Sequence, residues 1–264
     1  MLRRRLLVML LVTIAVAGAC SNKEDPNVAL TELLVGAPTK TLAENSSKVV
    51  VAVAVAGTTT TSYSANGEFD FKKGLGRFNL DLSKLGIKGG DGLSEVRFSG
   101  DSAFMQLGEK EWLKVDLASL GNSGINPPTA PLYYLRGATG TVRKVATETV
   151  RGDTTTRYAM TVDLDRSIAD APSGVKDDIR QTIRQLGTSE LATEAWIDGQ
   201  GRLRRLSYVI DLSTLARGSD SSAIGGLKAV YEYYDFGVTI EVTEPPASEV
   251  TEVGRGPRSG PAKR

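Results

Sequence analysis

The sequence predicts an α+β fold built on antiparallel strands, with a few helices. From residue 48 onward, apolar and polar side chains alternate along short segments that glycine-containing turns separate. This pattern is typical of antiparallel strands with one buried and one solvated face. Residues 27–47 and 173–187 show helical spacing instead. With 264 residues, of which 41% are hydrophobic and 24% charged, the chain is long enough for one sizeable core.

Two helices are expected before the first strand, over residues 27–35 and 38–47. Pro38 suits the first turn of the second helix, and Thr41 precedes Glu44 by the spacing of a capping box. Strands follow over 49–56, 63–71, 77–82, 96–98, 103–107 and 112–115. In the segment 63–71, the side chains predicted to share the buried face are Tyr63, Ala65, Gly67, Phe69 and Phe71.

The second half of the chain repeats this organisation. A short helix over 132–135 is followed by strands 141–150 and 155–164, an amphipathic helix over 173–187, and a hairpin of 190–198 with 202–212 around an Asp-Gly-Gln-Gly turn. An aromatic-rich strand over 227–241 ends before Pro245 and Pro246. Residues 247–264 have little apolar content and are expected to be a disordered tail.

The first 19 residues have the features of a secretory signal. Three arginines precede an uncharged apolar run, and small residues lead to Cys20. The run is too short to span a bilayer. Its end resembles the bacterial lipobox, although Ala17 stands where leucine is usual. We therefore expect acylated Cys20 to be the mature N-terminus, residues 20–26 to be a tether, and the protein to be lipid-anchored at the extracytoplasmic face of the cell membrane.

The composition argues against several classes of function. Histidine is absent, and Cys20 is the only cysteine, so the commonest general base, a conventional catalytic triad and thiolate zinc sites are missing. Without residues 1–19 the chain has 29 basic and 31 acidic side chains, which gives no electrostatic signature of nucleic-acid binding. Asp177 and Asp178 fall on the polar side of the 173–187 helix. We expect no catalytic residue, no metal and no cofactor.

Several local signatures, taken in order, resemble the actinobacterial LppX/LprG lipoprotein family. They are residues 135–138 (Leu-Arg-Gly-Ala), the hairpin 148–158, the segment 195–198 (Ala-Trp-Ile-Asp) with 201–206, and 234–237 (Tyr-Asp-Phe-Gly) before the two prolines. The family is similar in plan to the carriers LolA and LolB. The resemblance implies a half-barrel over residues 27–246, in which one curved antiparallel sheet wraps over helices and encloses a hydrophobic cavity for the acyl chains of envelope lipids.

The inner face of such a sheet is where lipid contacts would fall. Each of these side chains is expected either to contact lipid or to belong to a packed core: Phe69, Phe71, Phe78, Leu80, Phe98, Met160, Val162, Trp196, Tyr208 and Ile210.

Two functions from different classes are favoured at this point, ahead of an enzyme, which would require carboxylates that the sequence does not identify. The first is a non-enzymatic carrier of acyl lipids or glycolipids, which exchanges them with an envelope transporter or acceptor protein. The second is an envelope interaction or sensing module whose interior is filled by side chains. In the second, the threonine-rich segments 58–61 and 154–156 and an exposed aromatic strand with Tyr231, Tyr233 and Tyr234 would present a protein-binding surface.

Overall fold

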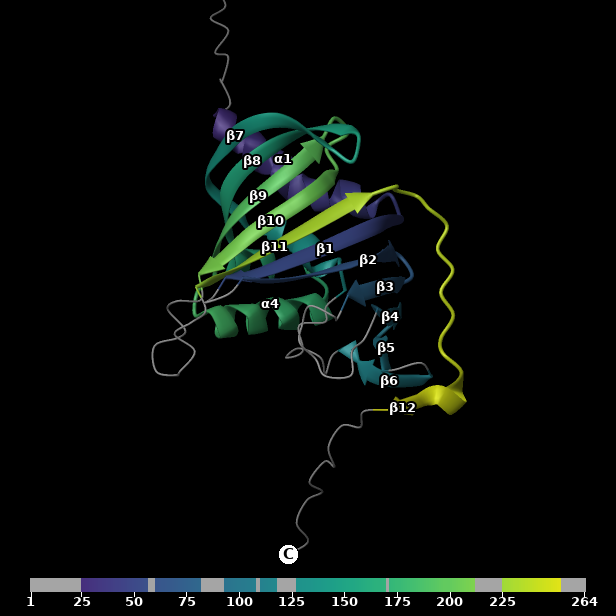
Figure 1. Cartoon of the computed structure of the whole chain (residues 1–264). Coiled ribbons are helices and arrows are strands. Elements are labelled where there is room, and N and C mark those ends of the chain that lie inside the picture. The colour runs from purple at the N-terminus through teal and green to yellow at the C-terminus, as the bar shows by residue number, and fades with distance from the viewer. Residues whose placement is uncertain are drawn as a thin grey trace, which may run out of the picture.

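A computed structural model describes residues 25–56, 60–81, 93–107, 110–117, 127–169, 171–211 and 225–252. The strands among these residues form one strongly curved sheet, drawn in Figure 1, with the order β12-β6-β5-β4-β3-β2-β1-β11-β10-β9-β8-β7. All pairs are antiparallel except β12 with β6. The strands are β1 (Ser46–Ala56), β2 (Thr61–Asp70), β3 (Leu75–Asp81), β4 (Leu93–Ser99), β5 (Ser102–Leu107), β6 (Glu111–Asp116), β7 (Ala138–Val150), β8 (Asp153–Asp163), β9 (Glu190–Asp198), β10 (Leu203–Asp211), β11 (Gly226–Tyr234) and β12 (Val250–Glu252).

Helices cover the concave face of the sheet, which we call the inner face. They are α1 (Pro26–Leu42), α2 (Ala130–Tyr134), the 3₁₀ turn η3 (Leu135–Gly137), α3 (Leu164–Ser167) and α4 (Ser173–Leu186). Helix α1 packs against β7, β9 and β10, and α2 packs against α3 and α4. In Figure 1, α4 runs below the central strands. The predicted fold class, a single curved antiparallel sheet wrapped over a few helices, is confirmed.

Strand β1 lies at the centre of the sheet and joins its two halves. It pairs with β2 on one side and with β11 on the other, so that Val51 lies opposite both Ala65 and Tyr231. Directly opposed residues of antiparallel strands point to the same face. The β1–β11 ladder therefore connects the strands from the first half of the chain, β1–β6, with those from the second half, β7–β11.

The expected pair of N-terminal helices is wrong, because α1 is one continuous helix with Pro38 in its interior. Its buried residues Leu34, Ala37, Pro38 and Thr41 form one stripe across both expected segments. Burial of that common stripe outweighs the cost of an interior proline. The predicted capping box is also wrong, since Thr41 lies in the last turn of α1. Asp25 caps the start of the helix by accepting a hydrogen bond from the Asn27 backbone N–H at 2.9 Å.

The last strand of the main sheet ends earlier than the sequence suggested. Strand β11 stops at Tyr234, where Asp235 (φ 48°) and Gly237 (φ 74°) adopt left-handed backbone conformations that break the strand. The chain then runs as an extended segment across the strand ends of the first half, the yellow trace in Figure 1. We call residues 235–249 the strap. It is tied to β1 and β4 by hydrogen bonds from Ser46 Oγ to Val238 O (2.6 Å) and from Arg97 Nη1 to Thr243 O (3.0 Å).

The expected tail 247–264 and the domain end at 246 also need correction. Residues 247–249 form the 3₁₀ turn η4 (Ala247–Glu249), and β12 pairs with the edge of β6. A low apolar content does not prevent this short strand, because its backbone groups pair with an otherwise open sheet edge. All described helices and strands thus lie between Pro26 and Glu252. Cys20, the signal segment and most of the tether fall outside the described residues, and so does residue 253 onward.

Candidate functional site

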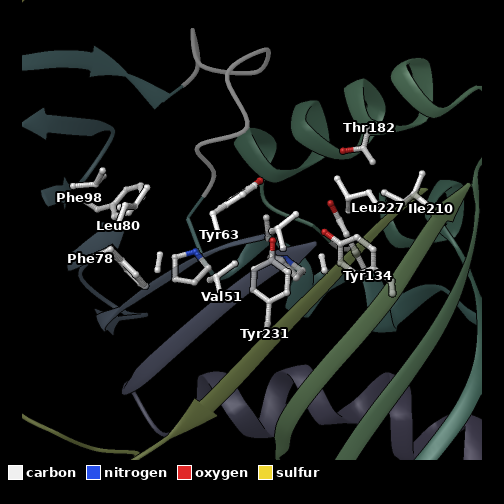
Figure 2. Close-up of a pocket in the computed structure, with 18 of the residues that line it drawn as sticks. Val51, Tyr63, Phe78, Leu80, Phe98, Tyr134, Thr182, Ile210, Leu227 and Tyr231 are labelled. Atoms are coloured by element: carbon white, nitrogen blue, oxygen red, sulfur yellow. The ribbon is translucent and has the colours of Figure 1, made fainter. Parts of the chain in front are cut away.

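A cavity of about 430 Å³ lies between the inner face of the sheet and the helices α2 and α4. Figure 2 shows its lining, which comes from both halves of the sheet. The residues are Val51, Val53, Tyr63, Ala65, Phe78, Leu80, Val96, Phe98, Pro128, Ala130, Pro131, Tyr134, Thr182, Leu186, Tyr208, Ile210, Leu227, Ala229 and Tyr231. The volume falls in the range of about 300–1,000 Å³ that is typical of small-molecule sites.

The strand register explains why these residues meet. Val53 lies opposite Tyr63 on one side and Ala229 on the other, and Ala229 lies opposite Tyr208. A row of inner-face side chains therefore runs straight across four strands. The neighbouring row contains Tyr231, Val51, Ala65 and Leu80. These two rows form the floor of the cavity.

Buried hydrogen bonds fix the helical side of the cavity. Ser167 Oγ of α3 donates to the backbone carbonyl of Tyr134 at 3.0 Å, and Tyr233 Oη donates to the carbonyl of Pro128 at 2.7 Å. Gly137 allows α3 to come this close, because a Cβ at this position would clash with the Asp163 carbonyl and the Ser167 hydroxyl. These contacts hold α2 and the residues before it against the sheet.

Three tyrosines from separate elements form a cluster at the cavity wall. The rings of Tyr134 and Tyr208 lie 5.7 Å apart between centroids, and those of Tyr208 and Tyr231 stack at 6.2 Å. Burial raises the pKa of all three hydroxyls. They consequently remain protonated at physiological pH and are available as hydrogen-bond donors.

Half of the sequence-predicted contact residues lie where the cavity is. Phe78, Leu80, Phe98, Tyr208 and Ile210 all line it. The structure therefore brings together residues from β3, β4 and β10 that the sequence suggested separately. The side chain of each is directed to the inner face, as the alternation along its strand indicated.

The other five predicted residues do not line the cavity. Phe69 packs on Phe98 with ring centroids 5.8 Å apart, and Phe71 lies 6.2 Å from Phe69, so both belong to the packing beside it. Met160 and Val162 are buried in the core at 6% and 0% exposure. They lie on β8, where the inner face packs against helices instead of opening into the cavity.

Trp196 lies on the opposite, outer face of the sheet. Its neighbours Ala195 and Ile197 point into the core, so the strand alternation directs the indole outward. There the indole N–H donates to Glu148 Oε2 at 2.8 Å, and the guanidinium groups of Arg157 and Arg205 lie over the ring. The indole is buried by charged side chains, and for this reason its aromatic character misled the prediction.

Most lining residues from β1, β11 and α2 were missed from the sequence. Val51 and Val53 belong to an apolar run whose two faces look alike in composition. Tyr134 lies in a helix too short for periodicity to indicate its buried side. Pairing of β1 with β11 could not be deduced from either strand alone, although the alternation in residues 227–233 was a usable signal for Tyr231.

The interaction-module hypothesis predicted an exposed aromatic strand, and this prediction is wrong. Tyr231 lines the cavity and Tyr233 is fully buried, whereas only Tyr234 points to the outer face of β11. Thr155 in the segment 154–156 is also buried, at 1% exposure. In the described part of the chain, the interior contains a cavity rather than the filled core that this hypothesis required.

Charged groups lie outside the cavity lining. Asp178 of α4 lies one helical turn before the lining residue Thr182, and its pKa rises to about 6 through partial burial and the charge of Asp177. Within the described ranges, no three His, Cys, Asp or Glu side chains are grouped closely enough to hold a metal ion. None of the described helices is both long and apolar enough to span a membrane.

No protein-family description and no curated protein sequence matches the chain. Solved structures are similar to it at low sequence identity. Lipoprotein LppX of Mycobacterium tuberculosis is 17% identical over 80% of this chain and 98% of its own, with a TM-score of 0.49. LprF of Mycobacterium bovis is 15% identical over 84% and 99%, with a TM-score of 0.48. A LolA-superfamily protein of Nitrosomonas europaea is 9% identical over 80% and 94%, with a TM-score of 0.34. The names of these structures include the lipoprotein LppX and the LolA superfamily, which the sequence signatures also resemble.

Proposed function

We propose that this protein is a non-enzymatic carrier that binds acyl lipids or glycolipids in the cavity between the sheet and helices α2 and α4. The observation that supports this most directly is the apolar cavity of about 430 Å³ itself. Each methylene group moved from water into such a space stabilises a complex by about 0.8 kcal/mol. A saturated acyl chain matches a lining made mostly of valine, leucine, phenylalanine and alanine.

The proposal includes anchoring through acylated Cys20. The described residues begin at Asp25, and the five Cα–Cα steps from Cys20 to Asp25 span no more than about 18 Å when fully extended. A cysteine that carries two or three acyl chains holds a protein stably on a membrane. The cavity would then work close to the membrane that supplies its lipid, on the extracytoplasmic side, and would pass its lipid to an acceptor protein of the envelope.

The test compares two phenylalanine substitutions in residues 20–264 with Cys20 replaced by serine. This stretch contains every described helix and strand. Ala65→Phe inserts a ring into the cavity, whereas Ala54→Phe places the same ring on the outer face of the neighbouring strand β1. Both alanines are half-buried. The pair therefore separates cavity filling from general effects on the sheet.

Native mass spectrometry of each purified form measures the lipid that is bound. We expect lipid on the parent chain and on Ala54→Phe, and much less on Ala65→Phe. Circular dichroism melts establish that both variants are folded. The proposal fails if the parent chain carries no lipid and binds none from vesicles of phosphatidylcholine and diacylglycerol, or if Ala65→Phe binds as much lipid as Ala54→Phe.

A further inference from the structure

The cavity has two chemically different ends. In Figure 2, Phe78, Leu80 and Phe98 lie together at one end, whereas Tyr134 and Thr182 lie at the other, near α4. The rings of Phe78 and Phe98 meet edge to face at 5.9 Å between centroids, and Leu80 beside them is also apolar. Figure 2 shows Tyr63 and Tyr231 between the two ends and Tyr134 at the second end.

The hydroxyl groups of the tyrosine cluster interact with one another and with α4. Those of Tyr208 and Tyr231 shift each other's pKa, and Thr182 shifts the pKa of Tyr134. Thr182 Oγ1 in turn donates to the Asp178 carbonyl at 2.9 Å. A pair of hydroxyls has two protons and its mutual bond uses one of them. Even a mutual bond between Tyr208 and Tyr231 would therefore leave the pair one donor and several lone pairs for a ligand.

The charge balance of the lining restricts what that ligand group can be. All lining residues in the described part of the chain are uncharged. An anionic group held there would lack a cationic partner, and burying an unpaired charge is costly. The charge of Asp178, on α4, raises the pKa of Tyr134. This field opposes a second anion at the same end.

We propose that Tyr134, Tyr208 and Tyr231 form a polar subsite that binds an uncharged hydrogen-bonding group of the lipid, an ester or a hydroxyl, while the acyl chains extend toward Phe78 and Phe98. This inference rests on the proposed lipid-carrier function and adds ligand selectivity and orientation to it. Diacylglycerols and other uncharged esters fit the subsite. Phospholipids and free fatty acids, with ionised headgroups, do not.

Two lipids with identical acyl chains provide the first test. Short-chain diacylglycerol and phosphatidylglycerol are titrated against residues 20–264 with Cys20→Ser, by displacement of a fluorescent fatty-alcohol probe. We expect diacylglycerol to bind at least about 10-fold more tightly, which corresponds to the cost of leaving one charge poorly paired. Equal affinity, or tighter binding of phosphatidylglycerol, would overturn the inference.

Single hydroxyl deletions provide the second test. Tyr134→Phe, Tyr208→Phe and Tyr231→Phe each remove one oxygen without changing the ring, and we expect each to weaken diacylglycerol binding about 3- to 10-fold. Tyr158→Phe is the matched control. Tyr158 is 7% exposed and lies in the core on β8, outside the cavity lining. Its substitution should leave the affinity unchanged.

An infrared measurement reports the ester directly. The carbonyl stretching band of diacylglycerol labelled with ¹³C at the ester carbon should shift to lower frequency on binding, and Tyr208→Phe with Tyr231→Phe should reverse that shift. If the lipid binds but neither its affinity nor the carbonyl band depends on the tyrosines, the subsite proposal fails, while the carrier proposal is retained. If neither lipid binds at all, the carrier function itself fails.

Discussion

Thr41 at the end of α1 and Leu203 at the start of β10 are joined by a fully buried hydrogen bond. The Leu203 backbone N–H donates to Thr41 Oγ1 at 2.9 Å, and the same hydroxyl donates to the Ala37 carbonyl at 2.8 Å. Thr41 and Leu203 are both 0% exposed. One side chain in the last turn of α1 therefore docks the helix on the second half of the sheet.

Replacement of Thr41 by valine should destabilise the fold by about 1–3 kcal/mol. Valine keeps the shape of threonine but leaves the Leu203 N–H buried without an acceptor. Thr41→Ser keeps the hydroxyl and should lower the free energy of unfolding less than Thr41→Val does. Urea denaturation followed by circular dichroism measures both. A valine variant as stable as the parent would mean that this bond does not hold α1 in place.

Asp178 should make stability fall between about pH 4 and pH 6. Its pKa is raised to about 6 in the fold from the ordinary 3.8, so the neutral carboxyl is favoured in the folded chain. Its stabilising contribution is complete below about pH 4 and is lost as the pH rises through about 6. Because this carboxyl is only partly buried, we expect a loss of only about 1 kcal/mol.

The matching variant is Asp178→Asn, which cannot ionise. It should exceed the parent in stability at pH 7 and equal it near pH 4, as measured by melting temperature against pH. Asp177→Asn should only reduce the pH dependence of the melting temperature, since the charge of Asp177 is the smaller of the two causes that raise the pKa of Asp178. A parent profile that is flat over this interval would contradict the raised pKa.

Strand β12 should protect the amides of β6 from hydrogen exchange. Val250, Thr251 and Glu252 pair in parallel with Trp112, Leu113 and Lys114. A chain that ends at residue 249 lacks this ladder, whereas one that ends at residue 252 keeps it. We expect faster exchange at residues 112–114 in the shorter chain alone. Equal exchange in both chains would favour the disordered tail expected from composition.

Trp196→Phe should leave lipid binding unchanged, although Trp196 was among the predicted contact residues. Phenylalanine keeps most of the ring but loses the indole donor to Glu148. We expect a loss of about 1 kcal/mol in the free energy of unfolding, with an unaltered amount of lipid in native mass spectra. Lower lipid occupancy in a fully folded variant would mean that the outer face contributes to binding.

The sequence predicted the elements of this fold better than their limits. Alternation placed most strands, and the strong amphipathic stripe and Gly187 placed α4 within one residue. The failures occurred where long-range contacts decide local structure. Pro38 lies in a helix interior because the stripe around it is buried, and β12 exists because β6 offers an open edge.

The cavity was less predictable, because alternation distinguishes the two faces of a strand but not an empty interior from a packed one. Phe98 and Met160 have the same sequence signature, yet only Phe98 faces the cavity. The difference depends on which helix lies opposite each strand. Trp196 shows the second limit, since a large aromatic side chain can be buried by arginines on a face that composition alone would assign to the core.

The central position of β1 has a consequence for how the chain folds. Apart from β12, each half of the sheet pairs strands that are consecutive along the chain, but the β1–β11 ladder joins segments from opposite ends of the described chain. Such pairing carries a large loop-closure entropy and is expected to form late. Neither half alone encloses the space between Phe98 and Tyr208. Under the proposed function, a nascent or partly unfolded chain would therefore be unable to bind lipid in this space. A bound lipid would then indicate that the two halves of the sheet have joined.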